Sequence, residues 1–310
     1  MTNQIKGVLL HLGHNMWQPV DTELRLREDL WRKATDAAVA KGMNLLLVDV
    51  GEGVVFPSHP ELAIKGSWSP DKLKAEIARL RGMGLEVVPK LNFSATHDEW
   101  LGEYSHMVST EPYYQVVKDV IADVAEIFGR PRFFHLGWDE ETANHQSRYD
   151  YAVVRGSELW WHDFLYTVAC CEKAGVRPWV WSDYGWHHPD YVTRCPKGVL
   201  QSNWYYDEAL GGMSLAKEKN RFWNILQLFL DLEKAGFDQV PCGSNWLSGA
   251  HRAKKLPTNE SIIPLVKFCR ERIRPERLKG FLMAPWASLN TEQNLQVNLD
   301  GLDLFVRALA

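Results

Sequence analysis

The chain has 310 residues, of which 45% are hydrophobic and 24% are charged, a composition typical of a soluble globular protein with a sizeable core. Its net charge of -4 includes no block of basic residues, and no apolar run reaches the roughly 18 residues of a membrane span. We therefore expect neither nucleic acid nor a membrane as a partner. The amino terminus lacks the charged and apolar regions of a signal peptide, which favours a cytoplasmic protein or a chain whose export signal was trimmed.

Apolar runs with the character of buried parallel strands recur along the whole chain. They cover residues 7–12, 44–50, 86–92, 132–138, 177–182, 199–204, 239–245 and 280–286. Helical patterns lie between these runs. One begins at Ser69-Pro70-Asp71, which reads as an N-cap followed by a first-turn proline and acid. Further helices are predicted over 113–128, 158–174 (capped by Ser157) and 222–235, and each stops at a glycine: Gly129, Gly175 and Gly236.

Eight strand and helix pairs at a spacing of about 35 residues predict an α/β fold, a single (β/α)8 TIM barrel that spans residues 1–310 as one catalytic domain. A doubly wound sheet is the alternative. It would have fewer strands and a phosphate-binding glycine loop, and the sequence contains no GxGxxG.

Five cysteines cannot all pair with one another, and Cys170 and Cys171 are adjacent within a predicted helix. The sequence has no CxxC and no Cys/His spacing of a zinc site. We therefore predict reduced, buried thiols.

In a barrel, chemistry gathers at the carboxyl ends of the strands, and here an aromatic residue stands at six of the eight predicted strand ends. Trp offers a sugar's apolar face a large contact area, while carboxylates, amides and imidazoles suit its hydroxyls. We expect a carbohydrate site, although each tryptophan alone could equally be barrel packing. The residues after the strands are His11, His14, Asn15, Trp17, Asp49, Glu52, Asn92, His97, Trp138, Asp139, Glu140, Glu141, Trp181, Asp183, Tyr184, Trp186, Trp204, Tyr205, Tyr206, Asp207, Asn245, Trp246 and Trp286.

Three consecutive carboxylates, Asp139, Glu140 and Glu141, follow the fourth strand. Crowded carboxylates repel one another, so at least one is expected to keep its proton near neutral pH. A protonated carboxyl beside an ionised one is the pair of groups that cleaves a glycosidic bond in glycosidases. The alternative is a solvated acidic loop, which remains our expectation for Glu141.

A metal site is the main competing interpretation, with His11, His14 and Asp183 as candidate ligands. The two histidines are three residues apart rather than in an HxH pair, and carboxylates outnumber histidines, so no metal is predicted. A nucleophilic serine is disfavoured because the sequence has no GxSxG elbow.

Several of these segments together resemble one known family. Residues 135–140 (HLGWDE) look like the H-x-G-[GA]-D-E signature of the glycoside hydrolase family 20 β-N-acetylhexosaminidases, at the end of barrel strand four. Residues 84–89 (GLEVVP), followed by His97, resemble the third strand of that family. Weaker similarities, in the same order as in the family, are found at 59–62 (HPEL), 202–207 (SNWYYD) and 284–286 (APW).

The resemblance implies a retaining reaction in which the substrate's own 2-acetamido oxygen attacks the anomeric carbon, without a cofactor. Glu140 would be the general acid, its pKa raised by the adjacent carboxylate, and Asp139 would orient the acetamido group. Tyr205 would donate to the acetamido oxygen and Asp207 would hold a hydroxyl. The remaining expected substrate contacts are His14, His97, Trp138, Trp181, Asp183, Trp204, Trp246 and Trp286.

The sequence departs from the family pattern in ways that bear on the sugar. His14 occupies the place of an arginine that holds sugar hydroxyls, and Trp138 replaces a small residue, so that its bulk is expected to narrow the site. The strand-two acid of the family is not clearly matched, although Asp49 and Glu52 are near. We therefore predict a glycosidase for an N-acetylhexosamine-containing glycan, with a non-catalytic carbohydrate-binding barrel and a metal-dependent hydrolase as alternatives.

Overall fold

The computed structural model describes residues 4–207, 223–247, 251–252 and 258–310. Its eight strands belong to one sheet with the order β6-β5-β4-β3-β2-β1-β8-β7, and parallel bridges from Gln201 to Gln239 and from Trp204 to Cys242 join the segments of the two outermost strands. This is the predicted (β/α)8 topology. The strands are β1 (Ile5–His11), β2 (Leu45–Asp49), β3 (Glu86–Lys90), β4 (Phe133–His135), β5 (Arg177–Trp181), β6 (Leu200–Ser202), β7 (Cys242–Gly243) and β8 (Gly280–Met283).

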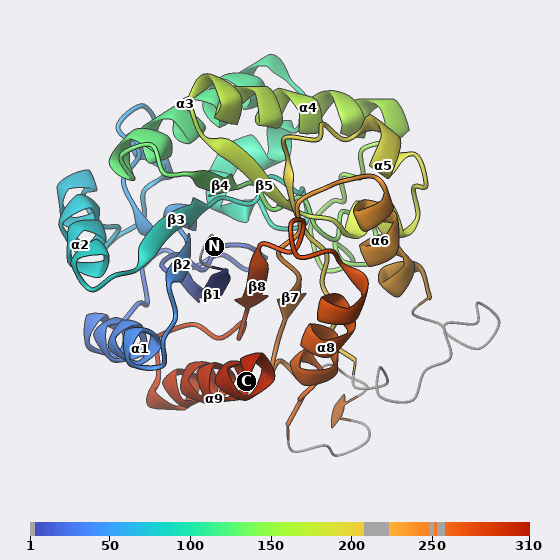
Figure 1. Ribbon diagram of the computed structural model, residues 1–310. Helices are drawn as coiled ribbons and strands as arrows, with labels where there is room; N and C mark the ends of the chain where they lie inside the picture. The colour runs from blue at the N-terminus through green and yellow to red at the C-terminus, as the bar shows by residue number, and fades with distance from the viewer. Residues whose placement is uncertain (1–3, 208–222, 248–250, 253–257) are drawn as a thin grey trace. The chain divides into compact units, whose positions relative to one another are not determined.

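Helices alternate with these strands along the chain (Figure 1). The α-helices are α1 (Glu28–Ala40), α2 (Pro70–Gly82), α3 (Glu111–Ile127), α4 (Ser157–Lys173), α5 (Tyr191–Arg194), α6 (Trp223–Lys234), α8 (Ile262–Arg272) and α9 (Glu292–Leu309). Short 3-10 helices follow several strands: η1 (Gly51–Gly53), η2 (Pro60–Leu62), η3 (Glu99–Met107) and η4 (Asp183–Trp186). Position 222, where a predicted helix begins, lies outside the described residues.

Most predicted helix ends are confirmed. Ser69 caps α2, since its side chain accepts a hydrogen bond from the backbone N–H of Lys72. The three glycines predicted to stop helices have the left-handed backbone of a helix terminus, with φ of 65°, 77° and 82° at Gly129, Gly175 and Gly236. Ser157 is an exception, because Gly156 occupies the N-cap and Ser157 is already the first helical residue.

The chain divides by its contacts into two compact units. Unit 1 comprises the described residues of 1–10, 27–46 and 181–310, and unit 2 comprises residues 11–26 and 47–180. In unit 1, β1 pairs with β8 and β8 with β7, and α8 packs beside α9 (Figure 1). In unit 2, β4 pairs with β3 and β5, and α3 packs beside α4.

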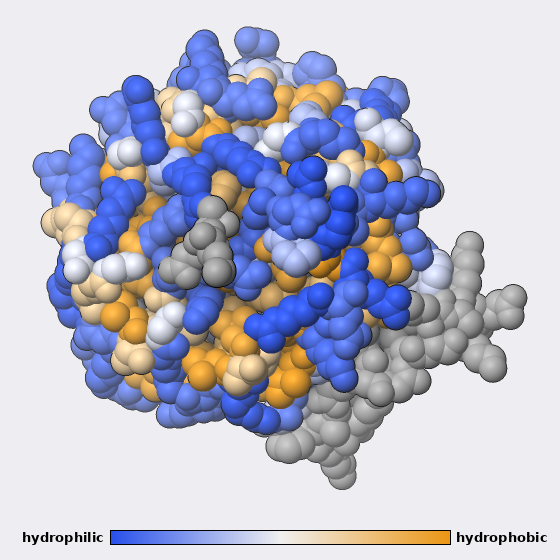
Figure 2. All heavy atoms as spheres, in the orientation of Figure 1, coloured by the Kyte–Doolittle hydropathy of each residue, from blue (hydrophilic) through white to orange (hydrophobic). Residues whose placement is uncertain are grey.

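All five cysteines are free and buried, as predicted. The face drawn in Figure 2 is mainly hydrophilic, with apolar residues scattered between the polar ones. Among the described residues, no helix combines the length and the apolar character needed to cross a bilayer.

Candidate active site

The segment that follows β4 makes a turn that sequence propensities do not foresee. Gly137, Trp138 and Glu140 have positive φ values of 71°, 74° and 57°. This left-handed conformation costs a non-glycine residue about 1–2 kcal/mol, and such outliers concentrate at functional sites. Position 137 requires glycine, because a Cβ atom there would lie 2.0 Å from Oδ1 of Asn92. The strand therefore ends at residue 135 rather than at the predicted residue 138.

The turn brings two of the three consecutive acids to one histidine. Nε2 of His97 lies 3.4 Å from Oδ2 of Asp139 and 3.4 Å from Oε2 of Glu140. The second oxygen of Asp139 accepts a 2.7 Å hydrogen bond from the Asn92 amide. The second oxygen of Glu140 lies 3.5 Å from Nε2 of His145. We call His97, Asp139 and Glu140 the carboxylate–histidine cluster.

Exposure differs within the carboxylate–histidine cluster. The side chains of His97 and Asp139 are 4% and 12% exposed, whereas that of Glu140 is 29% exposed. A hydrogen bond from the Thr96 hydroxyl to the backbone carbonyl of Glu140 holds the turn in place. Glu140 is thus the most exposed member of the cluster.

The pKa values in this cluster run opposite to the expectation from the sequence. Burial alone would raise the pKa of Glu140, but a hydrogen bond and the charges of His97 and His145 lower it below its ordinary value. Burial alone would lower the pKa of His97, but the charge of Asp139 and its interaction with Glu140 raise it. The predicted raised pKa of Glu140 is therefore wrong for the unliganded protein, because a histidine lies between the two acids. Both shifts favour the proton on the imidazole over the carboxyl of Glu140.

Trp138 does not have the predicted role. Its indole is 2% exposed, donates to the hydroxyl of Thr167 at 3.0 Å, and packs edge-on against Trp160 and Phe164 of α4. The prediction that Trp138 narrows the site and contacts the sugar is corrected, because the positive φ at this residue turns the ring toward α4. Its bulk lies in the helix layer.

Glu141 is also not the expected solvated carboxylate. Its side chain is 4% exposed and forms an ion pair with Arg155, whose side chain is 1% exposed. Arg155 also reaches Oδ2 of Asp163 at 3.2 Å and the Phe93 carbonyl at 2.7 Å, and its guanidinium lies 4.2 Å from the Trp138 ring. We call Arg155, Glu141 and Asp163 the buried ion-pair network. It fixes the residue directly after Glu140.

The loop after β1 is held by Glu52, which is 1% exposed. The two oxygens of Glu52 accept the backbone N–H groups of His14 and Asn15 at 2.6 and 3.0 Å. Burial, together with the charge of His11, lowers the pKa of His14 to about 4, so His14 is neutral at neutral pH. It can therefore serve a sugar hydroxyl as a neutral imidazole but not as a cationic replacement for arginine.

Asp49, the acid at the end of β2, interacts with two buried basic side chains. Asp49 accepts a 2.7 Å hydrogen bond from the fully buried Lys90 and lies 3.2 Å from Nδ1 of His11. Burial alone would raise the pKa of Asp49, yet Lys90 and His11 hold it well below its usual range. Asp49 therefore serves as the counter-ion of a buried lysine.

In unit 1, three tryptophans predicted to contact the sugar form an aromatic cluster with Tyr206. The rings of Trp181 and Trp286 are 5.9 Å apart, and Trp204 stacks on Tyr206 at 4.9 Å. The Trp286 indole donates to the Tyr206 hydroxyl at 3.1 Å. Trp286 also has a positive φ of 53°, a strained backbone like that of Trp138 and Glu140 in unit 2. We call Trp181, Trp204, Tyr206 and Trp286 the aromatic cluster.

Polar candidates in unit 1 lie beside these rings. Asp183, 8% exposed, accepts a 3.4 Å hydrogen bond from the Trp204 indole. Tyr205 is 1% exposed, and it is the neighbouring Tyr206 that contacts Trp286. Asp207 is partly exposed. The sequence motif at 202–207 thus contributes two rings, Trp204 and Tyr206, to the aromatic cluster and one buried ring, Tyr205.

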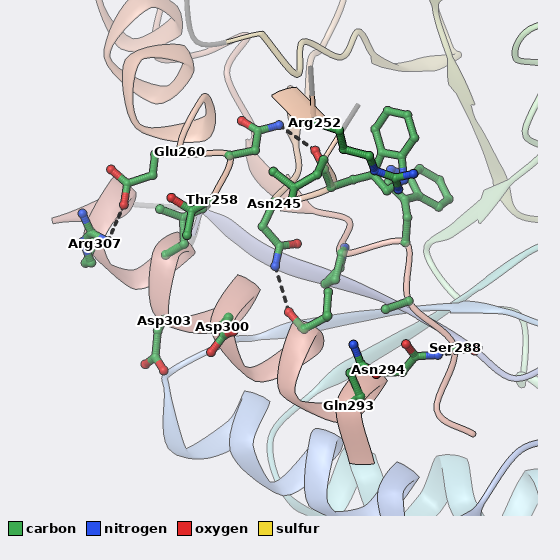
Figure 3. A pocket seen from close by; sticks show the side chains of 18 residues that line it. Asn245, Arg252, Thr258, Glu260, Ser288, Gln293, Asn294, Asp300, Asp303 and Arg307 are labelled. Atoms are coloured by element: carbon green, nitrogen blue, oxygen red, sulfur yellow. Dashed lines mark hydrogen bonds and ion pairs between the residues drawn. The ribbon is translucent and has the colours of Figure 1, made fainter. Parts of the chain in front are cut away.

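A cavity of about 710 Å³ opens beside Trp246 and Trp286 in unit 1. Figure 3 shows its polar wall, where the Asn245 amide donates to the Val297 carbonyl and Arg307 pairs with Glu260. Trp246 is 42% exposed, which leaves its ring accessible to a ligand. The other polar lining residues are Arg252, Thr258, Asn259, Ser288, Gln293, Asn294, Asp300 and Asp303.

Reasoning from the sequence missed two residues of the unit 2 site. His145 lies in the turns after β4 and Arg155 lies just before α4, and neither stands at a predicted strand end. Neither segment has hydrophobic periodicity, so no local pattern marks them. Only the run of three acids, which needs cations nearby when it is buried, could have pointed to partners of this kind.

The fold and the site define the class as a (β/α)8 barrel with an acid pair at the end of β4. No protein-family model matches the sequence, and no curated protein matches it. Solved structures with a similar fold include a β-N-acetylhexosaminidase from Bacteroides fragilis, at 13% identity and a TM-score of 0.66, which covers 96% of this chain. The chain spans 65% of the length of that protein.

Two further structures share the fold. One is a glycoside hydrolase family 20 exo-β-N-acetylglucosaminidase from Vibrio harveyi in complex with N-acetylglucosamine (14% identity, TM-score 0.63). The match covers 98% of this chain and 54% of the Vibrio harveyi chain. The other is Dispersin B (13% identity, TM-score 0.59), with 98% of this chain and 99% of that chain covered. At these identities the likeness establishes a common fold.

Proposed function

We propose that this protein is a retaining glycosidase that cleaves N-acetylhexosaminides, with the 2-acetamido oxygen of the substrate as the nucleophile. The observation that carries the proposal is the convergence of Asp139 and Glu140 on His97 at 3.4 Å each. The names of the proteins with a similar fold, β-N-acetylhexosaminidase and exo-β-N-acetylglucosaminidase, support the same substrate class. The general acid is Glu140, and Asp139 orients the acetamido group.

The spacing of the acids supports retention over inversion. Ligand atoms of His97, Asp139 and Glu140 lie within 4.8 Å of one another. An inverting pair would be about 6.5–9.5 Å apart to leave room for the attacking water. Asp139 is also a poor nucleophile here, because Asn92 and His97 occupy both of its oxygens. A carboxylate held in this way suits the task of binding an N–H and stabilising the positive charge that develops on the acetamido group.

Glu140 needs a proton to act as the acid, and His97 is the group that holds it in the free protein. A substrate that covers Glu140 removes water from its carboxylate and raises its pKa. The proton then moves from Nε2 of His97 to Oε2 of Glu140, and from Glu140 to the leaving oxygen. His97 is thus the proton store, and the charge of Asp139 keeps the imidazole protonated until the substrate binds.

The aromatic cluster of unit 1 is proposed, by itself, as a carbohydrate-contact surface. Trp204 and Trp286, which are partly exposed, present large rings to the C–H face of a pyranose. Trp181, 2% exposed, packs against Trp286 instead. Tyr205 and Asp207 are assigned to the acetamido group and a hydroxyl, as the family resemblance implies. The resemblance likewise assigns hydroxyl contacts to Asp183 and Trp246 within unit 1, and to His14 within unit 2.

Replacement of Glu140 by glutamine tests the proposal. Turnover of an aryl N-acetyl-β-glucosaminide should fall by roughly 100-fold or more, since removal of a general acid typically costs about 10²–10⁴-fold. Thermal unfolding should stay unchanged, because the two side chains are nearly isosteric. Glu86→Gln, in a surface pair with Arg132, is the matched control and should keep full activity. Undiminished hydrolysis by Glu140→Gln would falsify the assignment of the acid.

A second candidate function is metal-dependent hydrolysis. The carboxylate–histidine cluster offers three ligand atoms, the number that catalytic zinc takes from a protein. Dialysis against a chelator separates the two functions. Activity that survives chelation supports the glycosidase, and activity that is lost and then restored by Zn²⁺ supports the metal enzyme. Thermal stabilisation by N-acetylglucosamine without any hydrolysis would instead indicate a binding protein.

A further inference from the structure

Trp17 is a large aromatic residue at the edge of the carboxylate–histidine cluster, and the function proposed above gives it no role. It lies in the loop after β1 and is 47% exposed. Its ring meets the buried imidazole of His97 edge-on, with the ring centroids 5.5 Å apart and an interplanar angle of 79°. About half of the indole thus remains open to solvent while the ring contacts a member of the cluster.

The loop that carries Trp17 is fixed by hydrogen bonds on both sides of the tryptophan. Before it, Glu52 holds two consecutive backbone N–H groups. After it, the Gln18 amide donates to Glu99 at 3.1 Å and accepts from the backbone N–H of Asp150 at 3.3 Å. An aromatic surface that is held in place loses little conformational entropy when a ligand binds. Isolated exposed apolar residues are common on proteins, but this ring is anchored beside reactive groups.

The position of Trp17 relative to the acid indicates which part of a substrate it meets. A general acid protonates the oxygen of the bond that breaks, so the groups around the acid contact the leaving group. Trp17 adjoins His97, which lies on the Oε2 side of Glu140. On the Oε1 side lies His145, whose side chain is 41% exposed. The two oxygens of Glu140 therefore face two imidazoles, of which one packs against Trp17 and the other is accessible to solvent.

We propose that Trp17 is a specificity-determining residue: its indole is the platform for the leaving-group sugar, and it makes the protein favour a pyranose over a small alkyl leaving group. The apolar face of that ring stacks on the indole, and His145 binds one of its hydroxyls. The inference rests on the proposed glycosidase function and adds to it the residues that select the leaving group.

The test compares two substrates that differ only in the leaving group. Values of kcat/KM are measured for methyl N-acetyl-β-glucosaminide and for the β-linked N-acetylglucosamine disaccharide, with the wild type and with Trp17→Ala and Trp17→Phe. We expect Trp17→Ala to lower kcat/KM about tenfold on the disaccharide, which corresponds to about 1.4 kcal/mol, and less than about twofold on the methyl glycoside. Trp17→Phe should retain most of the activity on the disaccharide. Leu165→Ala, at an exposed position of α4, is the control for a surface truncation.

Each outcome bears on the inference. An equal loss on both substrates, with a shift in the pH profile, would mean that Trp17 acts through His97, and would overturn the platform. No loss on the disaccharide would overturn it as well. If the wild type hydrolyses neither substrate, the proposed function itself fails. That outcome differs from the other two, in which the wild type is active on both substrates and only the role of Trp17 is refuted.

Discussion

Replacement of Arg155 by methionine tests how strongly the buried ion-pair network stabilises the protein. Arg155, Glu141 and Asp163 have side chains that are 1%, 4% and 0% exposed. Methionine keeps the aliphatic part of the arginine but leaves two buried carboxylates without their cation. The variant also lacks the hydrogen bonds that Nε of Arg155 donates to the two oxygens of Glu141 at 2.9 and 3.1 Å. Removing one partner of a buried ion pair costs about 3–5 kcal/mol.

The expected change in Tm follows from the size of the protein. Unfolding entropy is about 2.1 cal/mol/K per residue, which for this chain amounts to about 0.65 kcal/mol/K. A loss of about 3–5 kcal/mol divided by this entropy lowers the Tm by about 5–8 °C. Calorimetry, or circular dichroism with a reversible transition, measures the shift. The double variant Arg155→Met with Glu141→Gln should recover part of the loss, because it also removes one of the two unpaired charges.

Arg132 offers a matched control on the surface. It contacts both oxygens of Glu86 at 3.0 and 2.6 Å, but the two side chains are 57% and 32% exposed. Such surface pairs contribute about 0.2–1 kcal/mol, so Arg132→Met should lower the Tm by no more than about 1.5 °C. If the two variants shift the Tm equally, burial does not set the strength of the Arg155 pair and the reasoning is refuted.

Two further predictions concern the carboxylate–histidine cluster. Because the pKa of His97 is raised, its imidazole should keep its proton to a higher pH than an ordinary histidine. The alkaline limb of kcat/KM should therefore move to lower pH in His97→Asn, where Glu140 alone holds the proton. An unmoved limb contradicts the role of His97 as proton store. In Gly137→Ala, an alanine would have to adopt a strained positive φ, and its Cβ atom would overlap with Asn92. The two effects together should destabilise the protein by about 2–5 kcal/mol. Gly175→Ala, with a similar φ but open space around the new Cβ atom, should lose only about 1–2 kcal/mol, and equal losses in thermal melts would argue against the overlap.

The order of strands and helices could be predicted from the sequence because it rests on local signals. Continuous apolar runs mark strands buried on both faces, and glycine ends a helix wherever a left-handed residue is required. The positions of His97 and Asp139 after neighbouring strands also followed from the predicted barrel, whereas their 3.4 Å approach is known from the structure. These features depend on periodicity and chain order, which a single sequence contains.

The inner structure of the site could not be predicted in this way. Trp138 and Glu140 adopt positive φ values, and no propensity forecasts this conformation for a tryptophan or a glutamate. The sequence alone made Glu141 a surface charge because its cation, Arg155, is fourteen positions away in a segment without periodicity. The pKa of Glu140 was predicted with the wrong sign, since the effect of the histidine exceeds that of the neighbouring acid only once the distances are known.

The burial of all five cysteines has a practical consequence for experiments on this protein. Thiol reagents attack the thiolate, and burial raises the pKa of Cys170, Cys171, Cys195, Cys242 and Cys269 above the ordinary value for a thiol. Maleimide dyes should therefore react with the native chain slowly. A single cysteine introduced on the surface near Trp17 could then carry a fluorophore that reports glycan binding, without prior removal of the natural thiols.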